Sequence, residues 1–134
     1  MSKKVILMNF GKNKNNKKKI FLISPVRLAT ITEMAEVGDY VERLESEGHE
    51  VHWPIRDTNQ NDSVGIRICH DNLQAIAGTD EVHLWYNQGS QGSIFDFGMV
   101  FALGKKLVIA NKDAIEPTPH KSFENVLLAY SEYI

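Results

Sequence analysis

The order of predicted elements constrains the fold of this chain more than any single motif does. Short strand-like segments alternate with helical patterns. The strand-like segments are residues 20–23, 50–53, 81–86 and 107–110. The helical patterns cover residues 31–44, 64–77, 93–103 and about 122–130. Such alternation predicts one α/β domain, with an open parallel sheet, right-handed crossovers and helices on both faces.

The helical patterns also predict caps and buried faces. Thr30 or Thr32 suits the N-cap of the first helix, and Ser122 suits that of the last. The first helix is expected to bury an apolar stripe made of Ile31, Met34, Ala35, Val41 and Leu44. The second helix is expected to bury Ile68 or Cys69, Leu73, Ile76 and Ala77.

We divide the chain into an N-terminal extension, residues 1–18, and an α/β domain, residues 19–134. Within the extension, residues 5–10 suit an extra edge strand. The lysine- and asparagine-rich run KNKNNKKK, residues 12–19, is typical of a solvated tether, with an anion-binding arm as the alternative. With 134 residues, of which 43% are hydrophobic, the chain has an ordinary globular size and composition.

Charge and cysteine content exclude several classes of partner. A formal net charge of −2 provides no field that would draw the chain to nucleic acid or to an anionic membrane. The single cysteine, Cys69, cannot form an internal disulfide, which favours a reducing compartment. No stretch approaches the ~20 apolar residues of a membrane span, and residues 5–8 are too few for a signal peptide. We therefore expect a soluble, cytoplasmic protein with neither nucleic acid nor membrane as a partner.

The loops that follow the predicted strands are the expected ligand site, because open parallel sheets bind ligands beyond the carboxyl ends of their strands. These loops begin at Ser24, Trp53, Asn87 and Asn111. In the first loop, the Ser24-Pro25 turn and the Arg27 guanidinium suit a phosphate or carboxylate group. A plain turn with a surface arginine is the alternative interpretation.

A glycine- and serine-rich segment, GSQGSIFDFG at residues 89–98, opens the third helix. Ser90, Gly92 and Ser93 would let a ligand approach the backbone closely. Asp96 is expected in the first helical turn, facing the strand ends, and a capping box with Ser93 is the structural alternative for it. Asp71 lies within the second helix, where aspartate has poor propensity; a solvated helix face is its alternative explanation.

Other classes of site are not supported by the sequence. The chain has no dinucleotide fingerprint, no P-loop and no Gly-x-Ser-x-Gly elbow. His49 and His52 are three residues apart on a strand and so point to opposite faces, and the remaining histidines are scattered. We therefore expect no metal site and no cofactor.

Taken together, these residues resemble the nucleoside 2-deoxyribosyltransferase family and its relatives, the 2′-deoxynucleoside 5′-phosphate N-hydrolases. The likeness runs from about Lys19 to Ile109. It rests on the opening strand with Ser24 and Pro25 and on three further segments. These segments are GHEVHWP at 48–54, DNL at 71–73, and GSIFDFG at 92–98 with ALGKK at 102–106.

The resemblance implies a covalent mechanism, in which a carboxylate attacks C1′ of the deoxyribose and another base or water resolves the glycosyl-enzyme. It implies that Asp96 is the nucleophile, although the family residue is usually the longer glutamate, and that Asp71 assists at the leaving base or the sugar. Ser90 matches the position at which the nucleotide hydrolases hold the 5′-phosphate with a serine. Together with Arg27 and Ser24, it favours 5′-monophosphates.

The resemblance further implies a flavodoxin- or Rossmann-like fold and an assembly of at least two copies, whose partner subunit completes the pocket. The ligand would be a small nucleoside or nucleotide. Trp53 is the best candidate to stack on its base among Phe21, Trp53, Tyr86 and Phe95. Two alternatives stay open: a catalytically silent nucleotide-binding module in which Asp96 is only a cap, and an unrelated flavodoxin-like protein.

Overall fold

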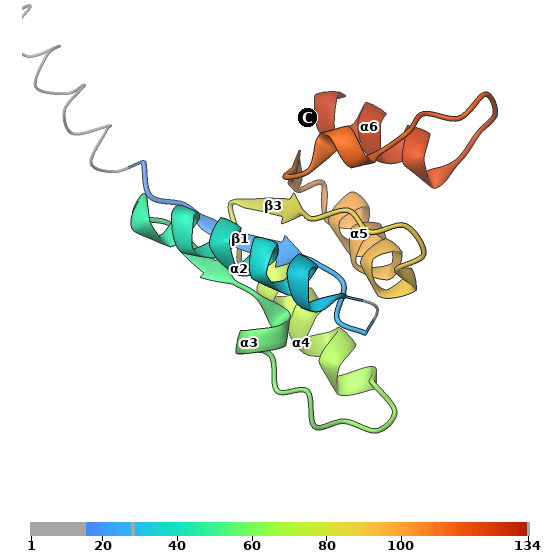
Figure 1. The fold of residues 1–134 in the computed structure, drawn as a ribbon. Helices are drawn as coiled ribbons and strands as arrows, with labels where there is room; N and C mark the ends of the chain where they lie inside the picture. The colour runs from blue at the N-terminus through green and yellow to red at the C-terminus, as the bar shows by residue number, and fades with distance from the viewer. Residues whose placement is uncertain (1–15, 28, 134) are drawn as a thin grey trace, which may run out of the picture.

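Four parallel strands form the centre of the fold in a computed structural model, which describes residues 16–27 and 29–133 (Figure 1). The strands are β1 (Lys19–Ile23), β2 (Glu50–His52), β3 (Glu81–Leu84) and β4 (Lys106–Ile109). Their order is β2-β1-β3-β4, and every neighbouring pair is parallel. The predicted open parallel sheet is confirmed. The strand expected at residues 5–10 lies outside the described residues.

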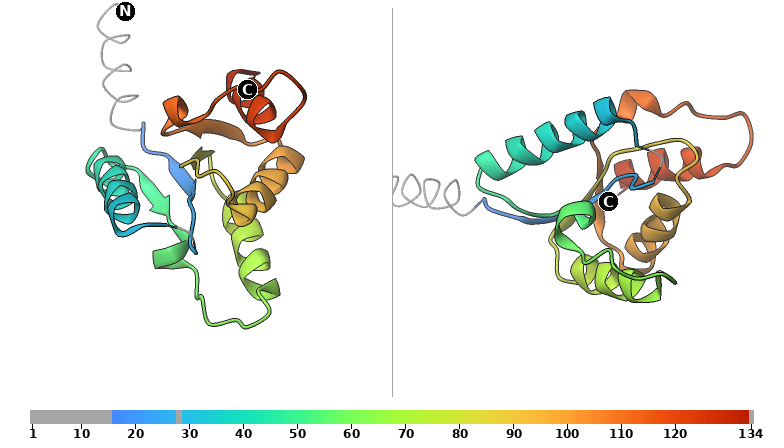
Figure 2. Two further views of the ribbon diagram at one scale, coloured as in Figure 1. Left: turned by 45° about the vertical axis from the view of Figure 1, so that its right-hand side comes forward. Right: turned by 60° about the horizontal axis from the view of Figure 1, so that its bottom comes forward.

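Helices cover both faces of the sheet, as predicted, but unequally (Figure 2). On one face lies α2 (Ile31–Ser46). The other face carries α4 (Ile66–Ala77), α5 (Gln91–Leu103) and α6 (Phe123–Tyr133). Two short helices, α3 (Pro54–Asp57) and η1 (Lys112–Ala114), follow β2 and β4. No helix of the described part of the chain is both long and apolar enough to cross a membrane.

The side chains of β1 divide the core into two layers, because successive residues of a strand point to opposite faces. Ile20 and Leu22 pack with α2, whereas Phe21 and Ile23 pack with the helices of the other face. All four are at most 1% exposed. Each such burial contributes about 1.5–3 kcal/mol, so the central strand is a rigid support for the loop that follows it.

The predicted caps are confirmed at both ends of the domain. Thr30 Oγ1 accepts a hydrogen bond from the Glu33 N–H (3.0 Å), and Ser122 Oγ accepts one from the Asn125 N–H (3.1 Å). Residues 54–57 belong to the loop that was predicted to begin at Trp53. They form the short helix α3 instead. Pro54 is its first residue, a position where the missing N–H of proline costs no hydrogen bond.

The predicted buried stripes are wrong in part. In α2, the predicted Val41 and Leu44 are buried, and Val37 joins them; Ile31, by contrast, is 91% exposed, and Ala35 is exposed as well. In α4, the predicted Ile76 is buried, but Ala77 is exposed and the other buried position belongs to Asn72. A pattern of apolar residues alone cannot reveal a polar residue that faces inward.

Arg56 covers the free edge of β2. Its Nη2 donates to the Val51 carbonyl (2.9 Å) and also contacts the carboxylates of Glu45 (3.0 Å) and Asp57 (2.8 Å). A side chain therefore occupies a backbone acceptor that a further strand would need.

A buried polar cluster lies on β3 beneath α2. Glu81 and His83 are 7% and 5% exposed, and the Glu81 carboxylate contacts His83 Nε2 (2.9 Å) and Lys18 Nζ (3.3 Å). His83 Nδ1 lies 2.6 Å from the Tyr40 hydroxyl. Burial lowers the pKa of His83, and a neutral ring that donates from Nε2 and accepts at Nδ1 satisfies both contacts.

Candidate active site

The loops after β1 and β2 meet at the carboxyl edge of the sheet. Trp53 Nε1 donates to Ser24 Oγ (3.1 Å), so the Ser24 hydroxyl keeps its own proton for another acceptor. The Trp53 ring packs against the core on the α2 side. Pro25 is buried, and Arg27 is exposed in the same loop. Of the residues predicted from these two loops, the structure brings Ser24 and Trp53 into direct contact.

Ser90, rather than Ser93, is the N-cap of α5. Its Oγ accepts from the Ser93 N–H (3.3 Å) and lies 2.8 Å from Ser93 Oγ. The helix starts at Gln91, two residues earlier than predicted, because Gly89 adopts a φ of +89° that turns the chain sharply before it. Asp96 consequently lies in the second helical turn, not the first. The alternative of a capping box between Ser93 and Asp96 is therefore wrong.

Asp96 is a partly buried carboxylate on a helix that carries no other charged residue. Burial raises its pKa to about 7. Within the described residues, its carboxylate has neither a salt bridge nor a hydrogen bond. Cys69 of α4 lies nearby, since burial and then the charge of Asp96 raise the pKa of its thiol. A desolvated carboxylate without a structural partner is typical of functional sites.

Asp71 pairs with Arg67, which lies one turn earlier on α4. Its Oδ2 accepts from Arg67 Nη1 (2.6 Å), and its side chain is 46% exposed. Arg67 also donates to the carbonyls of Asn59 and Asn61, which places the pair beside the loop between α3 and α4. No contact among the described residues joins Asp71 to Asp96, so the shared cleft expected for them stays a prediction.

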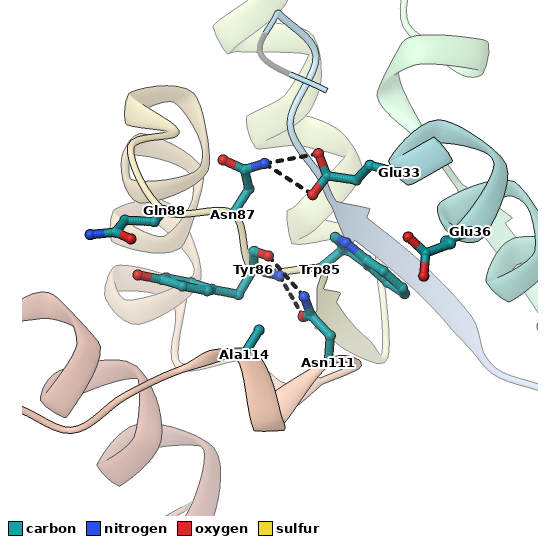
Figure 3. Close-up of a pocket in the computed structure, with 8 residues that line it drawn as sticks. All are labelled: Glu33, Glu36, Trp85, Tyr86, Asn87, Gln88, Asn111 and Ala114. Carbon is teal, nitrogen blue, oxygen red and sulfur yellow. Dashed lines mark hydrogen bonds between the residues drawn. The ribbon is translucent and has the colours of Figure 1, made fainter. Parts of the chain in front are cut away.

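A pocket of about 610 Å³ opens at the same edge of the sheet (Figure 3). The loops beginning at Asn87 and Asn111, both selected by the strand-end rule, contribute to it. Its lining residues are Glu33, Glu36, Trp85, Tyr86, Asn87, Gln88, Asn111 and Ala114. Of the predicted site residues, only Tyr86, a candidate to stack on the base, is among them. The described residues contain no group of His, Cys, Asp or Glu side chains that could hold a metal ion.

Comparison with solved structures shows which known proteins have a similar fold. The structure matches that of a 2-deoxyribosyltransferase from the psychrotolerant bacterium Bacillus psychrosaccharolyticus with a TM-score of 0.60, over 84% of this chain and 81% of that chain, at 19% identity. This chain has the 2-deoxyribosyltransferase fold. A CMP N-glycosidase, BcmB from Clostridium botulinum, matches with a TM-score of 0.49 and 23% identity, over 69% of this chain and 70% of that chain. No protein-family model and no curated protein matches the sequence.

Within this 2-deoxyribosyltransferase fold, Asn72 of the DNL segment is a buried polar residue for which the sequence predicted no role. It is 6% exposed, and its Oδ1 accepts from the Thr58 hydroxyl (2.9 Å). Thr58 Oγ1 in turn lies 2.8 Å from His52 Nε2. One signal was available in the sequence, since a polar residue four positions before the buried Ile76 occupies the same helix face.

Proposed function

We propose that this protein cleaves or transfers at the N-glycosidic bond of a 2′-deoxynucleoside or of its 5′-monophosphate, with Asp96 as the nucleophile. The observation that carries this proposal is the Asp96 carboxylate, which is partly buried and has no partner in the described chain. The likeness in fold to a 2-deoxyribosyltransferase supports the same class of reaction.

In the proposed reaction, an Asp96 oxygen forms a bond to C1′ while the bond from C1′ to the base nitrogen breaks. The electron pair of the broken bond leaves with the base, which also takes up a proton. The carboxylate stabilises the positive charge that develops on the sugar and then captures it as an ester. Water or a second base attacks C1′ in the next step and restores Asp96. Asp71 is proposed to assist at the base or the sugar.

The direct test is to incubate the protein with each deoxynucleoside and deoxynucleotide, with and without a second free base, and to separate the bases by chromatography. Release of base without an acceptor would identify a hydrolase, and exchange of bases would identify a transferase. Neither release nor exchange with any of these substrates would contradict the proposed reaction.

A catalytically silent nucleotide-binding module on the same fold is the second candidate. One observation favours it: aspartate at position 96 is one methylene shorter than the glutamate usual in the resembled family. A displacement of ~1 Å at a reacting atom can reduce a rate by about 100-fold. Such a module would bind nucleotides without releasing the base.

We expect 5′-monophosphates to bind more tightly than the matching nucleosides. Ser90 and the first N–H groups of α5 can receive a phosphate dianion, and the exposed Arg27 can form a charge-assisted hydrogen bond with it. One such bond contributes about 1.5–3 kcal/mol, so the affinity should rise by at least about tenfold.

Calorimetry measures the difference in affinity between a 5′-monophosphate and its nucleoside. Arg27→Ala should reduce it, whereas Arg43→Ala, on α2, should not; equal affinities for wild type would remove the preference for nucleotides.

We also propose that two copies associate through the outer face of α5. Phe95 and Phe101 are 56% and 60% exposed there, and a helix that is apolar on nearly all sides is normally buried. A second copy on this face would lie beside Asp96. Phe95→Glu should yield a monomer, as measured by light scattering, and should reduce turnover in an activity assay. Tyr133→Glu, at the end of α6, should leave the dimer intact, and a monomeric wild type would contradict the proposal.

A further inference from the structure

The side chain of Asn111 continues the pairing of β3 and β4 beyond the strand ends. The last backbone hydrogen bond between these segments runs from the Ala110 N–H to the Leu84 carbonyl (2.8 Å). Asn111 Oδ1 then accepts from the Tyr86 N–H (2.6 Å), and Asn111 Nδ2 donates to the Tyr86 carbonyl (2.8 Å) (Figure 3). The carboxamide therefore acts like the peptide group of an adjacent strand and fixes Tyr86.

The next loop residue is held from α2. Asn87 Nδ2 lies 2.9 Å from each carboxylate oxygen of Glu33 (Figure 3). The Asn87 carbonyl accepts from the Ser90 N–H (3.2 Å), and Ser90 caps α5. A continuous series of contacts thus runs from β4 and α2 through Tyr86 and Asn87 to the first turn of α5.

We propose that Asn111 is a positioning residue: by clamping Tyr86, it fixes Ser90 for the 5′-phosphate and α5 for the reach of Asp96. The inference rests on the proposed function. Connecting loops are ordinarily the mobile part of a domain. Here the loop must hold its geometry, because a displacement of ~1 Å at the reacting atoms can reduce a rate by about 100-fold.

Asn111→Asp tests the clamp with almost no change in shape. The carboxylate can still accept from the Tyr86 N–H, but it replaces the Nδ2 donor with an oxygen that faces the Tyr86 carbonyl. Asn111→Ala removes both hydrogen bonds without adding a charge. It keeps the test available if the aspartate variant does not fold.

Asn125 provides a matched control. Its Oδ1 accepts from the Thr118 N–H (2.9 Å), and its Nδ2 donates to the Thr118 carbonyl (3.0 Å). The same pair of bonds here joins the first turn of α6 to the exposed loop before it, and Nδ2 also contacts Thr118 Oγ1 (3.2 Å) and the His120 carbonyl (2.8 Å). Asn125→Asp should therefore lower thermal stability by the same chemistry without reaching the start of α5.

Two measurements separate positioning from general stability. The first is hydrogen exchange of the amides of residues 87–90, and the second is the affinity ratio of a deoxynucleoside 5′-monophosphate to its nucleoside, with kcat measured alongside. In Asn111→Asp and Asn111→Ala, we expect faster exchange, a ratio close to one and a kcat about 10- to 100-fold lower. Asn125→Asp should keep the wild-type exchange, ratio and kcat.

If the Asn111 variants keep the wild-type ratio and kcat and only lose thermal stability, the inference is overturned and the proposed function stands. If the wild-type protein itself neither binds nor turns over any deoxynucleoside or deoxynucleotide, the proposed function is wrong and the inference is overturned with it.

Discussion

Asp96→Asn should abolish turnover of every deoxynucleoside or deoxynucleotide substrate and should at the same time stabilise the fold above pH 7. Asparagine has nearly the same shape but cannot form the glycosyl ester, so the covalent route is closed. If Asp96 had no part in the chemistry, the same substitution would leave turnover intact. Chromatography of released base and urea unfolding measure the two effects.

The sign of the stability effect follows from the raised pKa of Asp96. With a pKa of about 7, the folded protein keeps a proton that the unfolded chain releases near pH 4, so stability falls as the pH rises between these values. Asparagine avoids this loss. We expect a gain of about 1–3 kcal/mol at pH 8, where one pKa unit corresponds to about 1.4 kcal/mol, and little difference below pH 4. Turnover by wild type should rise with pH through about 7, because the nucleophile must be ionised.

Two further variants complete the test of Asp96. Asp39→Asn removes an exposed carboxylate of α2 and should change neither turnover nor stability. Asp96→Glu restores the reach of the usual family residue. An inert wild type with an active glutamate variant would identify a binding module that has lost its chemistry. A deoxyribosyl adduct on Asp96, trapped with a 2-fluoro sugar analogue and found by mass spectrometry, would support the covalent route.

Glu81→Ala should destabilise the protein by about 1–3 kcal/mol at pH 7, because it leaves a buried polar group without its partner. His83 would lose the acceptor for its Nε2 proton, and Lys18 would lose its counter-charge. Glu81→Gln keeps an acceptor for His83 and should cost less. Glu50→Ala, an exposed glutamate at the start of β2, should stay within about 0.5 kcal/mol of wild type.

Acid should reduce the effect of Glu81→Ala. Burial alone would raise the pKa of Glu81, but the hydrogen bonds from His83 and Lys18 outweigh burial and lower this pKa. A carboxyl with a lowered pKa stabilises the fold above its ordinary value and loses that contribution as the pH falls below about 4.3. Urea unfolding at pH 7 and at pH 3.5 measures the change. A loss below about 1 kcal/mol at neutral pH would contradict the role assigned to the cluster.

The sheet and its order of elements were predictable because their signals are local. The apolar run of β1 and the glycine-containing turns between elements are each short, so they can be read without tertiary contacts. The side of each helix that faces the core was less predictable. Ile31 has the right spacing for the core, yet it is the first residue of α2 and stays exposed, because burial at a helix start depends on tertiary contacts that spacing does not specify.

The candidate site divides in the same way. Ser24, Trp53 and Ser90 could be singled out because they follow strands or open a helix. The turn on which Asp96 lies depends on the φ of +89° at Gly89, which shifts the start of α5 by two residues. Two contacts could not be predicted because their partners are distant in the sequence. Asn72 binds Thr58, 14 residues away, and Asn87 binds Glu33, 54 residues away.

The position of the Arg56 side chain over the free edge of β2 has a consequence for how copies of this protein can associate in solution. An incoming chain that tried to extend the sheet at this edge would have to displace a cation from two carboxylates and from the Val51 carbonyl. Open-ended growth by strand addition is therefore disfavoured on this side. A two-fold contact through helical surfaces, such as the one proposed for α5, would by contrast close on itself and stop at a defined number of subunits.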